Sequence, residues 1–483
     1  MKKLILKTLQ STIQGDVFSE KEFLDFYSVD ASSYQIIPKV IVVPKNEKDV
    51  ISVIKIAKKF KASVTVRGAG TGLVGSALNN EIILDMKNFD SVKLGKNHVT
   101  IGPGTIKGRL DKILENKKKF FPPNPSIGSY CFVGGMLGNN SSGSRSLKYG
   151  SMIDNVKEIT IVNGEGKKIT LPKNKTISKK ILKICKKIDE KRFPKVTKNS
   201  SGYRIDKIKS INDSHKIIIG SEGTLGIILS AKLKIKNKPE KRVLFIIEYD
   251  SIFAASKNCI QINKTKPSAI EFVDKTTLEQ IKFKFNKKTK CLLFVEYDEN
   301  IVSSENKLRL VTTGKIIQKL SDEKDVFQWW KYRDSSLYYS LKSIKKEKRI
   351  PHVIEDAAVP IEDLPKLFGI LNRIKRKYKI KSITYGHAGN GNIHIRLISD
   401  RNNRNLIKKI AIEYFDEIIK IGGTITAEHG DGLARSEFIK KQYGPKNHQL
   451  FIQIKKLFDP ENTLNPGKVI SKKSTIIENL ENF

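Results

Sequence analysis

The sequence predicts a two-domain protein of the α+β class, and two observations carry this prediction. A chain of 483 residues exceeds the size of an ordinary single domain. From about residue 38, short apolar runs alternate with segments whose apolar residues recur at helical spacing, and near 237–243 this character shifts. We therefore expect an N-terminal helical segment over 1–35, a first domain over 36–238, a second over 239–470 and a flexible tail over 471–483.

The first domain is expected to open with a strand, a helix and a second strand. Asn46 stands where it can cap the helix that starts at residue 47. Glycine-rich turns dominate from 68 to 150. The expected strands, in order, are 40–44, 63–67, 159–163, 217–220 and 231–235.

The second domain is expected to mix strands with longer helices. Its strands are predicted at 243–249 and 292–297, with two more inside 380–400. Residues 300–380 are lysine-rich and predicted to be largely helical. Further helices are predicted at 252–265, 403–421 and 439–458.

The formal net charge of +40 comes mostly from lysine. Lysines are dispersed along the whole chain, and no zinc finger, helix-turn-helix or aromatic RNA-binding motif accompanies them. We therefore interpret the charge as compositional bias and expect no specific nucleic-acid partner. A weak attraction to a membrane surface stays open.

Cysteine spacing and hydropathy point to a reduced compartment. The four cysteines stand alone, without metal-binding or haem spacing: Cys131, Cys185, Cys259 and Cys291. No window approaches 18 uninterrupted apolar residues. We expect a cytoplasmic protein, with a peripheral location on the inner face of a membrane left open.

Three glycine-rich loops in the first domain are typical of a site for a large polar ligand. They span 66–73, 121–150 and 219–226. Their glycines let backbone N–H groups approach an anion. A Rossmann interpretation of the first loop fails, because a strand-like segment over 81–86 follows it instead of a helix. Ordinary turns are the alternative, and three such loops in 160 residues disfavour them.

Two short motifs near the C-terminal end concentrate metal ligands and proton carriers. Residues 385–396 contain His387 and His394, and residues 426–432 contain Glu428 and His429. Two histidines with one carboxylate form the ligand set of a metal site that keeps a position open. Because side chains alternate along a strand, Arg396 is expected on the same face as His394. Hydrogen-bonded structural histidines are the alternative.

The motifs together resemble a known flavoprotein superfamily. RGAGTGL, PPNPSIGS with GGMLGNNSSGSRSLKYG, and GSEGTLGI resemble the FAD-binding domain of the vanillyl-alcohol oxidase and p-cresol methylhydroxylase superfamily. GHAGNGNIHIR, TAEHGDG and NPGK resemble its FAD-linked D-2-hydroxyacid dehydrogenases, which include D-lactate dehydrogenase, the glycolate oxidase catalytic subunit and D-2-hydroxyglutarate dehydrogenase. The resemblance covers about 35–470. It implies a two-part FAD-binding domain and a C-terminal substrate (cap) domain with an antiparallel sheet.

The resemblance also assigns site residues. It gives a divalent, zinc-like metal to His387, His394 and Glu428, gives the role of base to His429, and makes Arg333 a candidate for binding the substrate carboxylate. The guanidinium of Arg396, by its own chemistry, also suits a substrate carboxylate. No His, Cys or Tyr occurs in 68–76, so we expect FAD to be bound non-covalently. The residues expected to bind FAD are Arg67, Gly68, Ala69, Gly70, Thr71, Gly72, Pro123, Ser126, Gly135, Asn140, Ser142, Gly143, Ile219, Glu222, Gly223 and Asn465.

Departures from the family pattern favour a small substrate. Arg396 stands where the 2-hydroxyglutarate enzymes commonly have Asn, and Leu337 replaces a hydroxyl residue. No lysine occurs around 354–356, where those enzymes place one. We expect oxidation of a small D-2-hydroxy acid, with D-lactate favoured and glycolate or D-2-hydroxyglutarate as alternatives.

The sequence also bears on the electron acceptor and on other binding partners. No CxxCH or iron–sulfur spacing occurs, so electrons are expected to leave to an external cytochrome, quinone or electron-transfer flavoprotein. Two other classes stay open: a basic nucleic-acid or surface-binding protein, and a metal hydrolase that would leave the glycine loops unexplained. A homodimer stays open as well.

Overall fold

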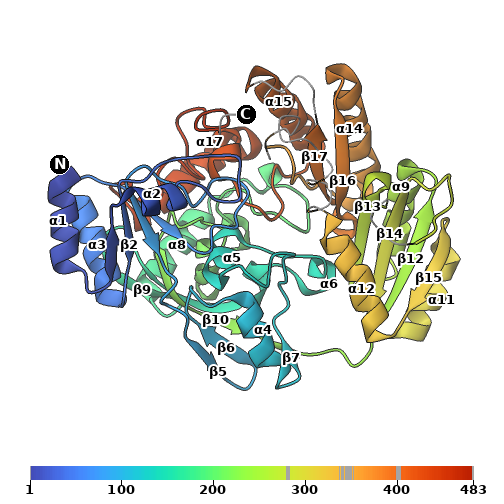
Figure 1. Ribbon diagram of the computed structural model, residues 1–483, viewed down its shortest axis with the longest axis horizontal. Coiled ribbons are helices and arrows are strands. Elements are labelled where there is room, and N and C mark those ends of the chain that lie inside the picture. The colour runs from blue at the N-terminus through green and yellow to red at the C-terminus, as the bar shows by residue number, and fades with distance from the viewer. Residues whose placement is uncertain are drawn as a thin grey trace.

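The structure is a computed structural model that describes residues 2–278, 283–336, 338, 342, 351, 353–398 and 404–480. Its strands and helices build two parts that lie side by side (Figure 1). The larger part holds a four-stranded, a five-stranded and a two-stranded sheet, and the smaller part, at the right of Figure 1, holds one antiparallel sheet with helices. The expected α+β class and the antiparallel sheet of the second domain are confirmed.

A four-stranded sheet opens the larger part. Three strands run parallel, and β1 adds to them antiparallel. Helices α1 and α3 pack on one face of this sheet and α2 on the other, because apolar side chains of its strands alternate between the two faces. Asn46 caps α3 as expected. The elements are α1 (Lys2–Thr12), β1 (Asp16–Phe18), α2 (Lys21–Tyr27), β2 (Val40–Val43), α3 (Glu47–Lys59), β3 (Val64–Arg67) and β4 (Ile82–Asp85).

A five-stranded antiparallel sheet, in the order β5-β6-β10-β8-β9, forms the rest of the larger part. Its strands are β5 (Val92–Leu94), β6 (His98–Ile101), β8 (Val156–Val162), β9 (Lys168–Leu171) and β10 (Ile227–Lys234), with the small pair β7 (Lys119–Phe120) and β11 (Lys236–Asn237) beside them. Its helices are α4 (Lys107–Glu115), α5 (Val133–Asn139), α6 (Ser146–Tyr149), α7 (Met152–Asn155) and α8 (Lys175–Cys185). The prediction of a strand over 217–220 is wrong. Residues Ile211–Ile218 form a 3-10 helix, and a short buried apolar run does not distinguish the two forms.

The smaller part is a six-stranded antiparallel sheet in the order β15-β12-β14-β13-β16-β17. Helix α12 covers one face with Trp329 and Trp330, and α9 and α14 pack on the other. The strands are β12 (Val243–Tyr249), β13 (Ala269–Asp274), β14 (Cys291–Tyr297), β15 (Lys315–Leu320), β16 (Lys381–His387) and β17 (Asn392–Ile398). The helices are α9 (Ile252–Asn263), α10 (Lys275–Leu278), α11 (Ile301–Val311), α12 (Glu323–Asp334), α14 (Leu364–Tyr378) and α15 (Arg404–Lys420).

The chain then returns to the larger part through α16 (Gly432–Arg435) and α17 (Ile439–Phe458). The expectation of a flexible tail is wrong over 471–480. Ile476 and Leu480 are buried, and the Tyr34 hydroxyl donates to the Ile476 carbonyl. Residues 481–483, and Leu337 on which one substrate argument depends, lie outside the described residues.

Several strands lie where the sequence predicts none, and three of them, β1, β13 and β15, show the reason most clearly. The N-terminal segment contains β1 as well as two helices, and β13 and β15 occupy stretches in which no strand was expected. Each of the three is completed by pairing with a strand elsewhere in the chain: β1 with β2, β13 with β14 and β16, and β15 with β12. Local sequence patterns alone therefore predict fewer strands than the sheets contain.

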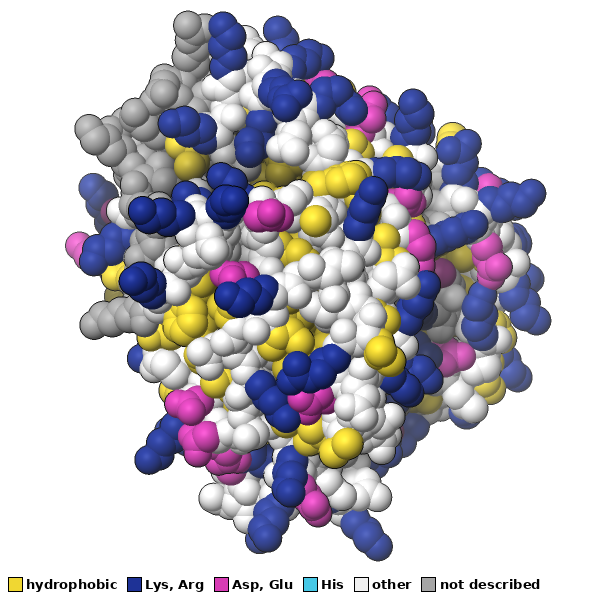
Figure 2. Space-filling view, turned by 90° about the vertical axis from the view of Figure 1, so that its right-hand side faces the viewer, with side chains coloured by type: hydrophobic (Ala, Val, Ile, Leu, Met, Phe, Trp, Pro, Cys, Tyr) yellow, Lys and Arg dark blue, Asp and Glu magenta, His cyan; other side chains and the backbone are white. Residues whose placement is uncertain are grey.

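The surface shows how the basic charge is distributed. Figure 2 shows Lys and Arg side chains scattered over the face formed mainly by the smaller part, interleaved with acidic and neutral groups and not gathered in one stripe. Among the described residues, no helix has both the length and the apolar character that crossing a membrane requires.

Candidate active site

One cavity of about 520 Å³ joins the glycine loops of the larger part to the histidine motifs of the smaller part. The first loop contributes 66–73, and helix α5 with its flanking turns contributes much of the wall. At the other end, the lining side chains are Arg333, Tyr385, His387, His394, Arg396, Glu428 and His429. Segments more than 300 residues apart in sequence therefore line one cavity.

Most residues expected to bind the flavin line this cavity. Those that do are Arg67, Gly68, Ala69, Gly70, Thr71, Gly72, Ser126, Gly135, Gly143, Glu222 and Gly223. Five others lie outside its lining: Pro123, Asn140, Ser142, Ile219 and Asn465. Asn140 is fully buried and donates to the Asn199 carbonyl, and Asn465 donates to the Ser76 and Glu222 carbonyls. These two side chains therefore hold the loops together behind the cavity.

The shape of helix α5 fits a bound dinucleotide. Gly135 lines the cavity, and a Cβ built on it would meet no atom within 4 Å. A glycine at such a position leaves room for a ligand to approach the helix backbone. Together with the first loop, this open position on α5 leaves room for FAD.

The three residues expected to hold a metal converge on one point. His387 Nε2 lies 2.9 Å from Glu428 Oε1, and His394 Nε2 lies 3.2 Å from the same oxygen. The tight turn between the two strands depends on Gly391, where a Cβ would meet the Val359 carbonyl oxygen at 2.0 Å. Two imidazole nitrogens and one carboxylate oxygen, all buried, are a donor set that suits a divalent metal.

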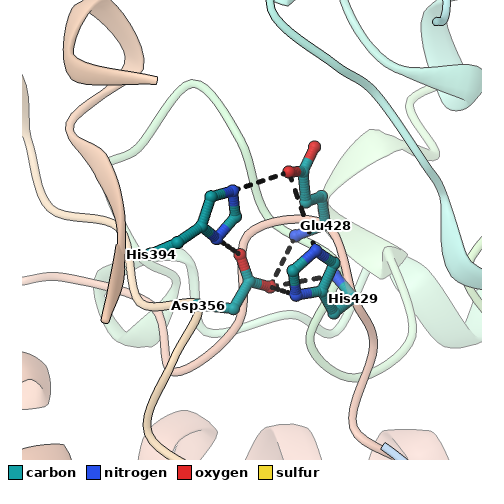
Figure 3. A group of neighbouring side chains, drawn as sticks. All are labelled: Asp356, His394, Glu428 and His429. Atoms are coloured by element: carbon teal, nitrogen blue, oxygen red, sulfur yellow. Dashed lines mark hydrogen bonds and ion pairs between the residues drawn. The ribbon is translucent and has the colours of Figure 1, made fainter. Parts of the chain in front are cut away.

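A second, overlapping group of possible metal ligands among the described residues shares His394 and Glu428 with this set but lacks His387. Asp356, His394, Glu428 and His429 place one ligand atom each within 4.8 Å of one another (Figure 3). Asp356 Oδ2 accepts backbone N–H groups from Ala427, Glu428 and His429 at 2.9–3.0 Å. Since these bonds occupy that oxygen, we interpret Asp356 as the anchor of the loop that carries Glu428 and His429.

A buried ion pair orients His387. Glu271 on β13 lies 2.8 Å from His387 Nδ1, and Arg333 on α12 pairs with the same carboxylate at 2.5 Å. The register of β13 and β16 brings Glu271 beside His387. With Nδ1–H donating to Glu271, the neutral ring presents Nε2 as the ligand atom. Arg333, expected to bind substrate, lines the cavity and uses part of its guanidinium on Glu271.

His429 is held in a comparable way by Glu355. Its Nδ1 lies 2.5 Å from Glu355 Oε1, and its ring stacks on His394 with centroids 5.0 Å apart. Burial acts to raise the pKa of Glu355, but the charges of His429 and Arg396 outweigh it and hold this pKa well below 4.5. An ionised Glu355 fixes the orientation of His429 and directs its Nε2 toward Glu428, 3.8 Å away.

The electrostatic environment of His394 is dominated by carboxylates. Burial acts to lower the pKa of His394, and the carboxylates of Glu355 and Glu428, 3.7 Å and 3.2 Å from its ring nitrogens, outweigh it and raise this pKa to about 10. The negative charge of these carboxylates also attracts a cation. The same negative field favours a divalent ion bound by these ligands.

Arg396 lies on the same strand face as His394 and lines the same cavity. Its nearest carboxylate oxygen, Glu355 Oε2, is 3.9 Å away. Its Nε and Nη1 are buried and have no hydrogen-bond partner among the described residues. A buried guanidinium with spare donors fits an anionic group of a ligand, and a carboxylate matches its planar fork.

Sequence reasoning missed the residues that hold the site in place, namely Glu271, Glu355, Asp356 and Lys198. One signal was present for Glu355 and Asp356. Two adjacent acids inside the apolar run 353–359 have to be buried with partners. Glu271 and Lys198 carry no comparable local pattern, and only the long-range pairing reveals them.

Comparison with known proteins agrees with these features. Residues 38–172 match the family model of the FAD binding domain, and residues 238–469 match that of the C-terminal domain of FAD linked oxidases. The chain is 28% identical to the glycolate oxidase subunit GlcD of Bacillus subtilis, covering 92% of each protein. It is also 28% identical to a D-lactate dehydrogenase of Archaeoglobus fulgidus, covering 93% of this chain and 96% of that protein.

A third relative and two solved structures extend the comparison. A D-2-hydroxyglutarate dehydrogenase of Haemophilus influenzae is 28% identical over 94% of this chain but only 50% of its own length. The fold matches p-cresol methylhydroxylase with a TM-score of 0.68 at 14% identity, covering 97% of both chains. It matches alkyldihydroxyacetonephosphate synthase with a TM-score of 0.70 at 18% identity, covering 96% of this chain and 86% of that one. The chain therefore belongs to the FAD-linked oxidases, as a flavoprotein oxidoreductase whose relatives include dehydrogenases of 2-hydroxy acids.

Proposed function

We propose that this protein oxidises a small D-2-hydroxy acid, with D-lactate favoured, to the 2-keto acid by transferring electrons to non-covalently bound FAD. The observation that carries the proposal is the single cavity, which places the flavin loops next to His387, His394, Glu428, His429 and Arg396. Relatives named as D-lactate dehydrogenase and glycolate oxidase subunit support the substrate class. A hydrolase would leave the flavin end of the cavity without a purpose.

His387, His394 and Glu428 would hold the metal, and the loops around 66–73 and α5 would hold the flavin. The metal supplies Lewis acidity toward the substrate hydroxyl, and the flavin accepts the hydride from C2. The donor set suits zinc. Each turnover releases one hydride and one proton, so the chain itself has to bind the acid, orient it and remove the proton.

Arg396 would bind the substrate carboxylate, with Arg333 beside it. Arg396 is permanently charged, buried and short of partners, and it lies next to the metal ligands on the same strand face. A carboxylate held there places the adjacent C2 hydroxyl toward His394 and His429. Fixing both ends of so small a molecule aligns C2 for transfer.

His429 would take the hydroxyl proton at Nε2. Glu355 holds Nδ1, so that Nε2 is the nitrogen left to face the cavity. The imidazole is the side chain whose ordinary pKa suits proton transfer near neutral pH. The electrons would then leave to an external carrier, a cytochrome, a quinone or an electron-transfer flavoprotein.

One set of spectra tests the proposal. The purified holoprotein is mixed anaerobically with D-lactate, L-lactate, glycolate or D-2-hydroxyglutarate, and bleaching of the flavin band is followed. Fastest bleaching with D-lactate supports the proposal. Fastest bleaching with glycolate or D-2-hydroxyglutarate would identify that acid as the substrate instead of D-lactate. A flavin that none of the four reduces contradicts it. Acid precipitation should release the flavin into the supernatant, and colour retained in the pellet would contradict non-covalent binding.

A further inference from the structure

The two oxygens of Glu428 face different surroundings. Oε1 points toward His387, His394 and His429. Oε2 accepts hydrogen bonds from Ser142 Oγ at 2.5 Å, Gly143 N at 3.2 Å and Lys198 Nζ at 3.0 Å. The carboxylate is therefore held from one side and presents its other oxygen to the imidazoles.

Lys198 has no role in the cavity itself. Its side chain is 1% exposed and does not line the cavity, and it precedes Glu428 by 230 residues. Its other contact is Asn392 Oδ1 at 3.3 Å, at the start of the strand that carries His394. Burying an ammonium group is unfavourable unless it is paired, so this lysine is committed to Glu428. Burial acts to raise the pKa of Glu428, and Lys198 is the largest of the charges that lower it.

We propose that Lys198 is a positioning residue that fixes Glu428 through Oε2, so that Glu428 binds the divalent metal through Oε1 alone. The inference rests on the proposed function, in which His387, His394 and Glu428 hold that metal. Three donors on Oε2 restrict the rotation of the carboxylate and occupy the oxygen that a two-oxygen coordination mode would need. Loss of Lys198 frees Oε2 and loosens the ligand.

The same contacts separate metal binding from flavin binding. Ser142 and Gly143 belong to the second glycine loop, but among the described residues Lys198 Nζ donates to Asn392 and Glu428 and not to the loop residues that line the flavin end of the cavity. Removing Lys198 should therefore weaken the metal while leaving the flavin in place. This selectivity distinguishes positioning of Glu428 from general support of the fold.

The test uses flavin-loaded protein stripped of metal by a chelator and titrated with Co²⁺, whose visible spectrum reports coordination geometry. The variants are Lys198→Met, Lys198→Arg and Ser142→Ala, with Lys195→Met as the matched control, since Lys195 is an exposed lysine of the same segment. We expect Lys198→Met to weaken Co²⁺ binding about 10- to 100-fold. Its Co²⁺ spectrum should change, its flavin content should not, and Lys198→Arg should recover part of the affinity. Ser142→Ala should weaken binding roughly fivefold, the effect of one hydrogen bond.

The possible outcomes separate this inference from the function on which it rests. If wild-type protein binds neither Co²⁺ nor Zn²⁺, the metal has no part in the proposed function, and the inference about Lys198 fails with it. Wild-type protein that binds Co²⁺, together with a Lys198→Met variant of equal affinity and spectrum, overturns the inference alone. Equal losses in Lys195→Met and Lys198→Met would also overturn it. If Lys198→Met does not fold, Ser142→Ala decides, and unchanged Co²⁺ affinity in that variant overturns it.

Discussion

At the residue scale, the polar side chains of the site divide into two groups. His387, His394, Arg396, Glu428 and His429 line the cavity. A second group lies behind them and fixes their orientation: Lys198, Glu271, Glu355 and Asp356. Substitutions in the first group should change chemistry or substrate binding. Substitutions in the second should change metal affinity and geometry first.

Replacing His429 by Ala should stop proton removal while leaving the flavin bound. Loss of a general base lowers rates by about 10²- to 10⁴-fold. We expect flavin reduction by the substrate to slow by that factor in stopped-flow measurements, with normal flavin content. His98→Ala, on the distant strand β6, is the control and should reduce normally. Near-normal reduction in His429→Ala would remove His429 from the mechanism.

Replacing Arg396 by Met should weaken substrate binding more than it slows flavin reduction at saturation. A hydrogen-bonded contact to a charged group contributes about 1.5–3 kcal/mol, so KM should rise roughly 10- to 150-fold. Lys at this position keeps the charge but loses the planar fork, and should fall between wild type and Met. The check is a steady-state comparison of kcat and KM, with Arg373→Met on the surface of α14 as the control. An unchanged KM would exclude Arg396 as the carboxylate site.

At the scale of elements, one hairpin and one helix build the two ends of the cavity. The β16–β17 hairpin carries His387, His394 and Arg396, and α5 supplies the open backbone strip at the flavin end. Both depend on glycine, in the hairpin because of the close approach at Gly391 and in the helix because of the open position at Gly135. A side chain added at either glycine should therefore act on the site more than on the core.

Replacing Gly135 by Leu should block the flavin while leaving the fold intact. The new side chain would extend from a position where a Cβ meets no protein atom within 4 Å, into the space assigned to the cofactor. The predicted result is a folded, colourless protein, measured by the ratio of flavin to protein absorbance. Gly369→Leu on α14 is the matched control, since Gly369 is also helical, exposed and unobstructed. Equal flavin content in the two variants would mean that the dinucleotide does not lie over α5.

The sequence predicts the residues that line this site well, and it predicts poorly the buried residues that hold them in position. Strand alternation was enough to place Arg396 beside His394, and the glycine pattern was enough to indicate loops around a ligand. Glu271 could not be placed, because its contact with His387 depends on the register of strands 116 residues apart. The strand that carries it, β13, was not expected either, since its alternation is masked by burial of every residue. Lys198 and Glu428 meet across 230 residues, for the same reason.

At the scale of the whole molecule, α6 lies where the larger part meets the smaller part (Figure 1). Arg145, which precedes α6, forms two hydrogen bonds to Glu296 on β14, and Lys148 pairs with Asp298. Glu296 also accepts from Trp330 Nε1 at 2.8 Å. The C-terminal end of the second glycine loop is therefore held to the smaller part by an ion pair whose carboxylate is fully buried.

Removing one partner of this pair should destabilise the protein strongly. Arg145→Met leaves Glu296 buried without its cation, which costs about 3–5 kcal/mol. Replacing both, as in Arg145→Met with Glu296→Leu, should recover most of the loss. Urea unfolding monitored by tryptophan fluorescence measures both. Arg309→Met, which breaks an exposed pair with Glu305 on α11, is the control and should change stability by less than about 1 kcal/mol. A similar loss in the control and Arg145→Met would refute a special role for this interface.

The Arg145–Glu296 pair also makes the free energy of unfolding depend on pH, and this free energy should fall in acid. Burial acts to raise the pKa of Glu296, but Arg145 outweighs it and the pKa lies below its ordinary value of 4.5. The carboxylate therefore contributes its full stability above pH 4.5 and loses it as the pH falls through the lowered value. We expect Glu296→Gln to be less stable than wild type at pH 7, and the difference to shrink below pH 4.5. If the difference between the unfolding midpoints of wild type and Glu296→Gln stayed the same from pH 7 down to pH 3, this prediction would be contradicted.

The return of the chain at Asn465 has a consequence for how the protein is made. Its backbone N–H donates to the Val64 carbonyl and its side chain donates to the Ser76 and Glu222 carbonyls, so three segments from the first half of the chain meet on one late residue. During synthesis these contacts cannot form until residue 465 has left the ribosome. The flavin loops are therefore completed only after residue 465 has been synthesised, and a nascent chain halted before this point should be unable to retain FAD.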